Sequence, residues 1–461
     1  MTTVASPCFS FLIKILLYVS LLCLLCVVHG ADEITVPVSS LFPSPNCKAS
    51  TSNVNSTVKL VHKHGPCSPL FQGEPVNHTQ LLLEDIARVE WIESKYSGAD
   101  ATNSPKDSAV SLEAKYSPNA AGYFVTIGVG TPKQDLTLLF DTGSALTWTQ
   151  CKPCAESCSE PIFDPSRSSS YANISFSDPS CLLLRSGTGH KPLPSGSTCS
   201  YRATYLSGAY SEGFFATETL TLSPIDAITR FKFGCGQKSE KIKGFAGLLG
   251  LARDEISLFG QSATKYGRSF SYCLPPSLSS TGYLTLGTGS RTSASVSFTP
   301  LITIPRRPLF YGIKITGISV GGKQLDIEET VFSTANTVID SGATFTRLPT
   351  KAYDALRSAF RQGMLKYKMS DPTPTLDTCY DLRGSTSITI PRIRFSFSGS
   401  VEVDLDPRGV LFGTNEKMCL AFAPSHPNTD LSIYGNVQQR TFEVVYDVAG
   451  GRIGFRAKGC S

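Results

Sequence analysis

Charged residues are scarce in this sequence, since Lys, Arg, Asp and Glu together make up 17% of its 461 residues. The formal net charge of +5 is small for this length, and no stretch concentrates lysine and arginine. A nucleic-acid-binding protein needs such a basic surface, so binding to nucleic acid is not expected. Histidines number only six and are scattered, and none accompanies a convincing nucleophilic serine or cysteine. A histidine-activated nucleophile is therefore not indicated either.

Long hydrophobic runs are limited to one, over residues 9–28, which His29, Gly30 and Ala31 follow. Its length suits a membrane anchor, but the small residues after it and the lack of a basic stop-transfer flank favour a cleaved signal peptide over residues 1–30. The C-terminus carries neither an anchor tail nor a retention signal. We expect secretion to the extracellular space, with the vacuole as the alternative, and no membrane anchor after signal removal.

Abundant glycine, proline, serine and threonine, with 10% aromatic residues, favour many short strands joined by turns. The length suits two lobes plus a leader. Residues 31 to about 110 are rich in Ser, Asn, Pro and Lys, with one helical pattern over residues 79–94, and we interpret them as a propeptide. Its cations are expected to pair with carboxylates of an active-site cleft and to block it; they are Lys59, His62, Lys63 and His64.

Cysteine usage agrees with export. Cys47 and Cys67 fall in the predicted propeptide, and ten further cysteines lie beyond residue 150, an even set that predicts up to five disulfides. These ten are Cys151, Cys154, Cys158, Cys181, Cys199, Cys235, Cys273, Cys379, Cys419 and Cys460. Cys151-Lys-Pro-Cys154 also has zinc-ligand spacing, but secretion favours disulfides, so no metal is expected. Asn55, Asn77 and Asn173 begin glycosylation sequons.

Two short stretches of the sequence are nearly the same. Leu-Leu-Phe precedes Asp141-Thr-Gly-Ser, and Val-Ile precedes Asp340-Ser-Gly-Ala. Each apolar run resembles a buried strand that ends at a carboxylate, and each glycine allows another backbone to approach. A single Asp-x-Gly is an ordinary turn signal, but two copies 199 residues apart indicate duplicated lobes that share one site. Paired carboxylates can hydrolyse a peptide bond, one as acid and one as base.

The repeat extends beyond the two aspartates. Phe-Ala-Gly247-Leu-Leu-Gly250 follows the first aspartate, and Ile-Tyr-Gly435 follows the second. Each stretch presents two apolar residues and then a glycine. We expect these glycines to pack behind the acid-bearing loops, where a side chain would collide.

As a set, these motifs resemble the pepsin-type (A1) aspartic endopeptidases, with Trp148 seven residues after Asp141. The cysteine cluster from Cys151 to Cys158, the Phe163-Asp-Pro that follows, Phe-Gly-Cys235-Gly and Ser-Tyr-Cys273-Leu resemble the nepenthesin-like plant subgroup more narrowly. The resemblance implies an all-β, bilobal fold whose two barrel-like lobes are related by a pseudo-twofold axis and flank a cleft. The peptidase domain would span residues 123–456, with an N-lobe at about 123–300 and a C-lobe at about 308–456.

The resemblance also implies a tyrosine-bearing flap over the cleft. Tyr205 and Gly208 match the flap, and Trp148 is expected near the substrate. Where the family usually has Tyr-Gly-Asp-Gly-Ser, this chain has Leu206, Ser207 and Ala209 at the small and polar positions. Because leucine lacks the backbone freedom of glycine, an altered flap geometry is expected.

Within the two loops, the resemblance makes Asp141 and Asp340 catalytic and gives their neighbours supporting roles. Hydroxyls across the lobe interface would fix the loops, and Ser144 would donate to the outer oxygen of Asp141. The supporting residues are Thr142, Gly143, Ser144, Ser341 and Gly342. Ala343 is the counterpart of Ser144 and lacks the hydroxyl, so the pKa of Asp340 is expected to rise relative to relatives that have it.

The sequence therefore predicts a secreted, monomeric aspartic endopeptidase that acts on polypeptides, is inhibited by its own propeptide and uses no cofactor. The alternative is a catalytically silent pepsin-like protein that binds or inhibits a glycosidase or another protein. Silent relatives tend to lose the two aspartates, which this chain keeps, whereas the departures in the flap and at Ala343 favour the alternative.

Overall fold

The structure is a computed structural model that describes residues 32–49, 57–73, 77–97, 122–155, 158–205, 209–240, 242, 244–287, 295–305, 307–334, 336–426, 431–457 and 459–460. The predicted signal peptide, the sequon at Asn55 and the flap residues Leu206, Ser207 and Gly208 lie outside these residues. Among the described helices, none has the length and apolarity needed to cross a bilayer.

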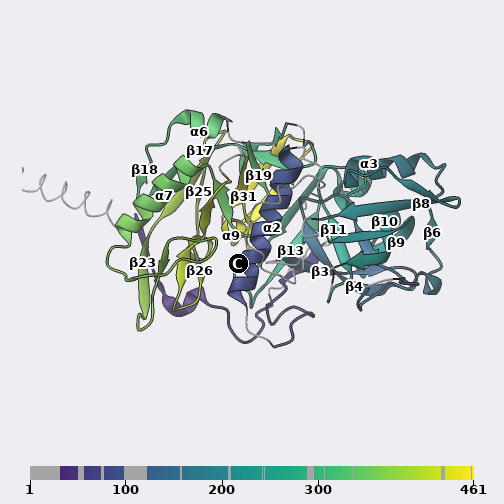
Figure 1. The fold of residues 1–461 in the computed structure, drawn as a ribbon, viewed down its shortest axis with the longest axis horizontal. Coiled ribbons are helices and arrows are strands. Elements are labelled where there is room, and N and C mark those ends of the chain that lie inside the picture. Colours follow the sequence, from purple (N-terminus) through teal and green to yellow (C-terminus); the bar gives the residue numbers. More distant parts are fainter. Residues whose placement is uncertain are drawn as a thin grey trace, which may run out of the picture.

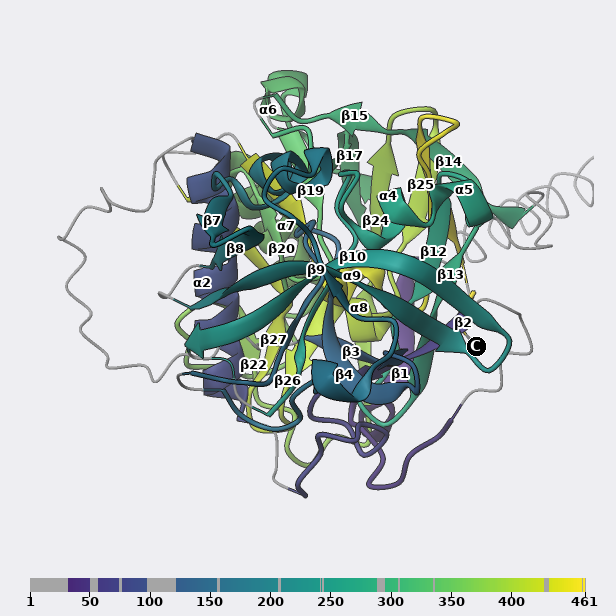
Figure 2. The same ribbon diagram turned by 90° about the vertical axis from the view of Figure 1, so that its right-hand side faces the viewer.

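The chain folds into mostly short strands, as its composition predicts, and the first lobe is built around one large sheet that also takes in β30 and β31 from the end of the chain (Figures 1 and 2). The long strands β9 and β10 cross this lobe in Figure 2. The strand order runs β14-β31-β30-β12-β13-β2-β3-β4-β11-β5-β10-β9-β8-β7, with β6 beside β9. The strands are β2 (Thr57–His62), β3 (Tyr123–Val129), β4 (Gln134–Asp141), β5 (Trp148–Gln150), β6 (Ala172–Asn173), β7 (Leu193–Ser195), β8 (Thr198–Thr204), β9 (Tyr210–Ser223), β10 (Asp226–Glu240), β11 (Gly247–Gly250), β12 (Ser269–Cys273), β13 (Thr281–Leu286), β14 (Ser297–Pro300), β30 (Glu443–Asp447) and β31 (Arg452–Arg456).

The second lobe consists of smaller sheets. Their orders are β15-β16-β19-β29-β20-β28, β18-β17-β24-β25, β21-β22-β27-β26 and β1-β23. The strands are β1 (Glu33–Pro37), β15 (Ile302–Thr303), β16 (Tyr311–Ile313), β17 (Ile315–Val320), β18 (Lys323–Gln324), β19 (Asn336–Ile339), β20 (Thr346–Leu348), β21 (Met369–Ser370), β22 (Cys379–Tyr380), β23 (Ser387–Pro391), β24 (Ile393–Phe397), β25 (Val401–Asp404), β26 (Leu411–Gly413), β27 (Met418–Leu420), β28 (Phe422–Pro424) and β29 (Leu431–Tyr434). The all-β, bilobal prediction is confirmed.

Helices are short, with two exceptions. The predicted helix after Pro349 is α7 (Thr350–Gly363), which buries Tyr353, Leu356 and Phe360 on one face. The other long helix, α2 (His78–Ser97), begins after Asn77, whose side-chain oxygen accepts a hydrogen bond from the Gln80 amide at 2.9 Å. The remaining helices are η1 (Val38–Leu41), η3 (Pro165–Arg167), η4 (Pro179–Leu182), α3 (Leu183–Thr188), α4 (Leu258–Gln261), α5 (Ala263–Tyr266), α6 (Glu329–Thr334), α8 (Pro407–Val410) and α9 (Asn436–Gln439).

The N-terminal segment, defined here as the described residues between 32 and 97, packs against both lobes. Strand β1 pairs with β23 of the second lobe, and β2 is inserted between β13 and β3 in the large sheet. Helix α2 then lies across the front of the junction between the lobes (Figure 1). The segment is therefore integrated into the fold at three separate places.

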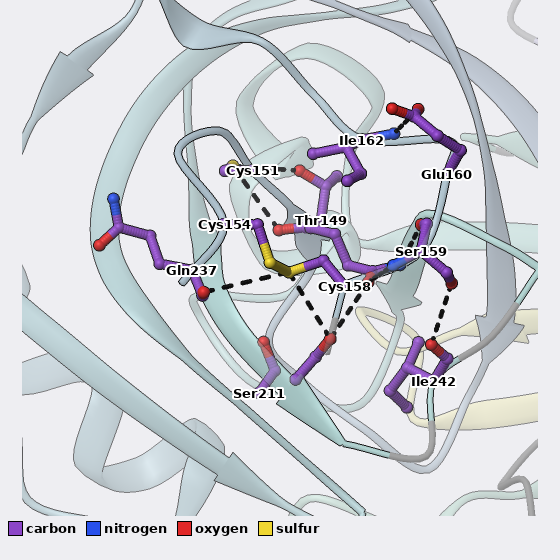
Figure 3. Close-up of a disulfide and its surroundings, with 12 residues drawn as sticks. Thr149, Cys151, Cys154, Cys158, Ser159, Glu160, Ile162, Ser211, Gln237 and Ile242 are labelled. Carbon is purple, nitrogen blue, oxygen red and sulfur yellow. Dashed lines mark hydrogen bonds between the residues drawn. A yellow bond between two sulfur atoms is a disulfide. The ribbon is translucent and has the colours of Figure 1, made fainter. Parts of the chain in front are cut away.

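The ten cysteines beyond residue 150 form five disulfides, and the structure supplies the connectivity that the sequence leaves open. The pairs are Cys151–Cys235, Cys154–Cys158, Cys181–Cys199, Cys273–Cys460 and Cys379–Cys419. A further disulfide, Cys47–Cys67, closes a loop within the N-terminal segment. Figure 3 shows the Cys154–Cys158 loop, beside which the Ser159 hydroxyl donates to the Ile242 carbonyl at 3.2 Å.

Candidate active site

Each candidate aspartate stands at the end of a buried strand. Asp141 is the last residue of β4, and Asp340 follows β19 directly. Strand β11 runs parallel to β4, and β29 runs parallel to β19 in the equivalent way. Both carboxylates are nearly inaccessible, with side-chain exposures of 2% and 0%. The two lobes thus bury one acid each by the same local construction.

The glycines behind the two loops have the role expected from the sequence. A Cβ atom on Gly250 would come within 2.3 Å of the Ala145 carbonyl oxygen, and one on Gly435 within 2.5 Å of the Phe345 carbonyl carbon. Both contacts are with backbone, which has no room to move away. Only glycine therefore fits behind either acid-bearing loop.

Hydrogen bonds join the two loops across the lobe interface. The Ser341 amide donates to the Thr142 hydroxyl at 2.9 Å, and the Thr142 amide donates to the Ser341 hydroxyl at 3.1 Å. The Thr142 hydroxyl also lies 3.4 Å from Asp340 Oδ1. The Gly143 amide donates to Asp141 Oδ1 at 3.0 Å. The reciprocal Thr142–Ser341 hydrogen bonds, which the family resemblance implied, fix the two carboxylates relative to each other.

The expected role of Ser144 differs from the structure. Its hydroxyl is buried and forms no hydrogen bond with any residue that the structure describes. Asp141 instead accepts hydrogen bonds from Arg88, through Nη2 at 2.7 Å and Nη1 at 3.3 Å. The Arg88 guanidinium thus donates to both oxygens of Asp141, where the sequence predicted a hydrogen bond from Ser144.

Arg88, on α2, binds both aspartates at once. Its Nη2 also donates to Asp340 Oδ1 at 3.0 Å, and its Nε donates to Asp340 Oδ2 at 3.0 Å. Burial alone would lower the pKa of Arg88, but the two carboxylates raise it, so the guanidinium stays charged. One planar cation therefore bridges the candidate dyad in a forked geometry on each side.

The environment of Asp340 favours its protonated form. Burial raises the pKa of Asp340, and the nearby carboxylate of Asp141 adds to this effect. The Arg88 guanidinium opposes it, and so does a hydrogen bond with the backbone of Gly342. Removal of the guanidinium would leave burial and like-charge repulsion to push the pKa of Asp340 higher still.

The cation that reaches the dyad is not one of those predicted. Lys59 and His62 lie in β2, whose residues pair with Tyr283 of β13 and Tyr123 of β3, and Lys63 and His64 follow this strand. Within the described residues, none of these four side chains contacts either aspartate. The predicted pairing is therefore wrong, because β2 fixes Lys59 and His62 in the sheet, with Lys63 and His64 directly after it, while α2 places Arg88 at the centre of the site.

The predicted flap tyrosine, Tyr205, contacts Trp148. Trp148 is fully buried, and its indole N–H donates to the Tyr205 hydroxyl at 2.7 Å. Trp148 therefore holds Tyr205 through a hydrogen bond, and its own side chain is inaccessible. Trp91 of α2 also packs near Tyr205, with its ring centroid 6.5 Å from that of Tyr205 and 6.4 Å from that of Phe310. A cavity of ≈ 110 Å³ remains here, lined by Trp91, Leu146, Tyr205, Leu309 and Phe310 among others.

Two lobes of β-strands, each presenting one aspartate on a hydroxyl-bonded loop at their junction, define a pepsin-like architecture. Comparison with known proteins agrees. The family model described as "Xylanase inhibitor N-terminal" matches residues 123–288, and "Xylanase inhibitor C-terminal" matches residues 310–457. The chain belongs to the plant pepsin-like (A1) aspartic protease family, as its motifs predicted.

Relatives by sequence carry aspartic protease names. An aspartyl protease family protein of Arabidopsis thaliana is 47% identical over 444 residues, which cover 93% of this chain and 94% of that protein. Aspartic proteinase nepenthesin-1 of Nepenthes gracilis is 33% identical, over 73% of this chain and 78% of its own. Among solved structures, basic 7S globulin from soybean has a TM-score of 0.59 at 18% identity, covering 74% of this chain and 92% of that one, and so shows the shared fold.

Ala343 offers a test of how the loop tunes Asp340. Its side chain is fully buried beside Val89 of α2 and Ile433 of β29. A hydroxyl at this position would stabilise ionised Asp340, so Ala343→Thr is expected to lower one apparent pKa of the dyad by about one unit. The pH–rate profile of the activated protein measures this shift. Ala343→Val, which has the same shape without the hydroxyl, is the control, and superimposable Thr and Val profiles would contradict the prediction.

Proposed function

We propose that this protein is a secreted aspartic endopeptidase that is synthesised as a latent precursor. The observation that carries the proposal is the pair of buried carboxylates on equivalent loops that hydrogen-bond to each other across the lobe junction. Secretion is supported by the predicted signal peptide and by six disulfides among the described cysteines. Asn77 and Asn173 are exposed, as glycosylation requires.

In the proposed reaction the dyad carries one proton, because two adjacent buried carboxylates resist double ionisation. The ionised carboxylate takes a proton from water, and the oxygen attacks the carbonyl carbon of the substrate. The protonated carboxyl donates its proton to the carbonyl oxygen. Collapse of the tetrahedral intermediate then breaks the C–N bond. The leaving amine takes the proton that came from water, and a hydroxyl of the intermediate returns its proton to the other carboxylate as the C=O bond re-forms. No cofactor is required, and the pair titrates as a unit.

The proposed substrates are polypeptides with bulky apolar residues beside the cleaved bond. The cavity next to the dyad has aromatic and leucine side chains on its walls, including Tyr205, Leu309 and Phe310. Trp91 of α2 contributes its indole to the same cavity. A large apolar side chain in this place would be removed from water on binding.

The N-terminal segment is the proposed inhibitor. Arg88 forms ion pairs with both candidate acids, and Trp91 lines the adjoining cavity, so α2 and a substrate would compete for the same place. Release requires α2 to leave the cleft. Cleavage between the described residues 97 and 122, followed by separation of the helix, would convert the precursor into the active form.

Buried histidines within the N-terminal segment are expected to make its release sensitive to acid. Burial lowers the pKa of His62 well below the ordinary value, with Arg440, His64 and Lys63 adding to the effect, while the Tyr123 ring packs at 5.3 Å. Burial, with Lys63, lowers the pKa of His64 from 6.5 to about 4. Both histidines therefore have a lower pKa in the docked segment than in the released one. Docking is fully stable above about pH 6.5, where the histidines are neutral in both states. Below this pH the released histidines bind protons more readily, so docking weakens.

The double variant His62→Gln/His64→Gln is therefore expected to lower the pH midpoint of activation, by about one unit. The midpoint is measured as the appearance of the processed form after stepwise acidification, followed by gel electrophoresis. Lys59→Gln, an exposed change on the same strand, is the control. An unchanged midpoint in the double variant would assign acid sensitivity to the aspartates alone.

A second candidate function is the binding of a glycosidase without catalysis. The matching family models bear the description of xylanase inhibitors, which favours this candidate, whereas retention of both aspartates and of the reciprocal Thr142–Ser341 bonds favours the protease. Acid-treated full-length protein, incubated with a denatured protein substrate with and without a pepstatin-type inhibitor, separates the two. Inhibitor-sensitive cleavage is expected. No cleavage, together with inhibition of a xylanase, would favour the second function.

A further inference from the structure

A second carboxylate-binding site lies next to the dyad. It is occupied by a carboxylate of α2 that lies one helical turn before Arg88. Asp85 is completely buried, and its Oδ1 accepts hydrogen bonds from the Thr344 amide at 2.7 Å and the Phe345 amide at 3.2 Å. Its Oδ2 pairs with the Arg347 guanidinium at 2.6 Å. Two amides and a guanidinium thus enclose one carboxylate, a donor set suited to a planar anion.

This site belongs to the C-lobe and directly adjoins the dyad. Thr344 and Phe345 follow Asp340 by four and five residues, and Arg347 follows it by seven. Arg347 pairs with Ile433 of β29 just as Trp148, seven residues after Asp141, pairs with Leu248 of β11. The pseudo-twofold thus places Arg347 where the first lobe has the tryptophan that supports the flap. One lobe offers an aromatic residue at this position, and the other offers a cation.

The guanidinium of Arg347 interacts with carboxylates of α2. The guanidinium is 11% exposed, and Asp85 supplies its carboxylate partner among the described residues. The positive charge of Arg347 also acts on Glu93 of α2. Burial raises the pKa of Glu93, and His426 and Arg347 oppose this rise. Departure of α2 would remove these carboxylates and leave a partly desolvated cation with two free amides in the wall of the cleft.

We propose that, in the activated protein, Arg347 and the amides of Thr344 and Phe345 form a subsite that selects an acidic side chain of the substrate, which Asp85 imitates in the precursor. The inference rests on the proposed protease function. Asp85 precedes Arg88 by three residues, or about 4.5 Å along the helix, whereas an extended peptide advances about 3.3 Å per residue. The acidic side chain therefore lies within about two residues of the cleaved bond.

The test uses matched peptides with blocked ends and an apolar pair at the cleavage point, in which one residue is either Glu or Gln. Glu is scanned through the two positions on each side of the bond, and acid-processed protein is assayed at pH 5.5, where a free glutamate is ionised. At one position kcat/KM is expected to be about tenfold higher for the Glu peptide. The preference should fade below about pH 4 as the substrate carboxyl becomes protonated.

Variants of Arg347 identify the source of the selectivity. Arg347→Gln should reduce the Glu/Gln ratio from about ten to about one, and Arg347→Glu should favour a Lys peptide over the Glu peptide. Arg394→Gln is the control, because Arg394 pairs with Asp404 in the β24–β25 ribbon. A merely structural role for Arg347 would change stability or overall rate but not reverse the charge preference. A ratio near one at every position, or a ratio unchanged in Arg347→Gln, would overturn the proposal.

Failure of the protease proposal gives a different result, namely that no peptide is cleaved. In that case fluorescently labelled Glu and Gln peptides are titrated onto the processed protein and followed by anisotropy. Tighter binding of the Glu peptide that Arg347→Gln abolishes would still support the subsite. Equal binding of the two peptides would reject it.

Discussion

Asp141→Asn and Asp340→Asn are each expected to lower kcat/KM for polypeptide cleavage by about 10²- to 10⁴-fold. Asparagine matches the shape of aspartate but can neither accept a proton from water nor share one with its partner. The reciprocal Thr142–Ser341 hydrogen bonds do not involve the carboxylates and should hold both loops in place. Activity should therefore be lost without loss of the fold.

The measurement requires processing that does not depend on the activity of the variant itself. A recognition site for an unrelated specific protease, inserted between residues 98 and 121, allows every variant to be activated in the same way. Thermal unfolding then checks the fold. Asp135→Asn is the control, since Asp135 is 57% exposed and pairs with Lys133 on the surface. Near-normal activity in either dyad variant would refute the proposed mechanism.

Arg88→Gln is expected to abolish the latency of the uncleaved precursor. Arg88 is 14% exposed and supplies the positive charge that both buried aspartates contact. Removal of one partner from a buried ionic network costs about 3–5 kcal/mol. Since each 1.4 kcal/mol is a factor of ten, the population with α2 released should rise by about 10²- to 4 × 10³-fold.

This prediction is tested on full-length protein at a pH above 6.5, before any processing is detected on a gel. Cleavage of a fluorogenic peptide and binding of a pepstatin-type inhibitor both report access to the dyad. Lys59→Gln removes the same charge from an exposed position on β2 and should leave the precursor latent. Arg88→Lys, which keeps the charge but loses the fork, is expected to give an intermediate result. Equal latency in Arg88→Gln and Lys59→Gln would show that blockage does not depend on the guanidinium.

Several features of the site were predictable because they depend on neighbours in the sequence. Asp141 and Asp340 end apolar runs, and a buried strand must end where a carboxylate meets a turn. Gly250 and Gly435 follow from the same logic, because only a residue without a side chain can lie against the backbone of Ala145 or Phe345. The helix of the N-terminal segment was also visible in its apolar periodicity.

The partner of the dyad could not be found in this way. The chain has 42 lysine and arginine residues, and nothing local distinguishes Arg88 from the cluster at residues 59–64. The one sequence feature that could have indicated Arg88 is its spacing of three residues from Asp85, which puts both on one face of α2. This spacing indicates a contact with the dyad only once the helix is known to lie across the cleft. The predicted role of Ser144 is also wrong, because the Arg88 guanidinium and the Gly143 amide already donate to the oxygens of Asp141.

The sequence by itself determined that the fold is rich in strands, that two aspartate loops are duplicated, and that glycines pack behind them. Each of these features depends on local backbone sterics and on the burial of short apolar runs. Tertiary structure alone decided which cysteines pair, which cation meets the dyad and that Arg347 encloses Asp85. These contacts join residues that are far apart in the chain, such as Asp85 and Arg347. Their existence depends on how two lobes and one helix are positioned in space, and no local pattern records that arrangement.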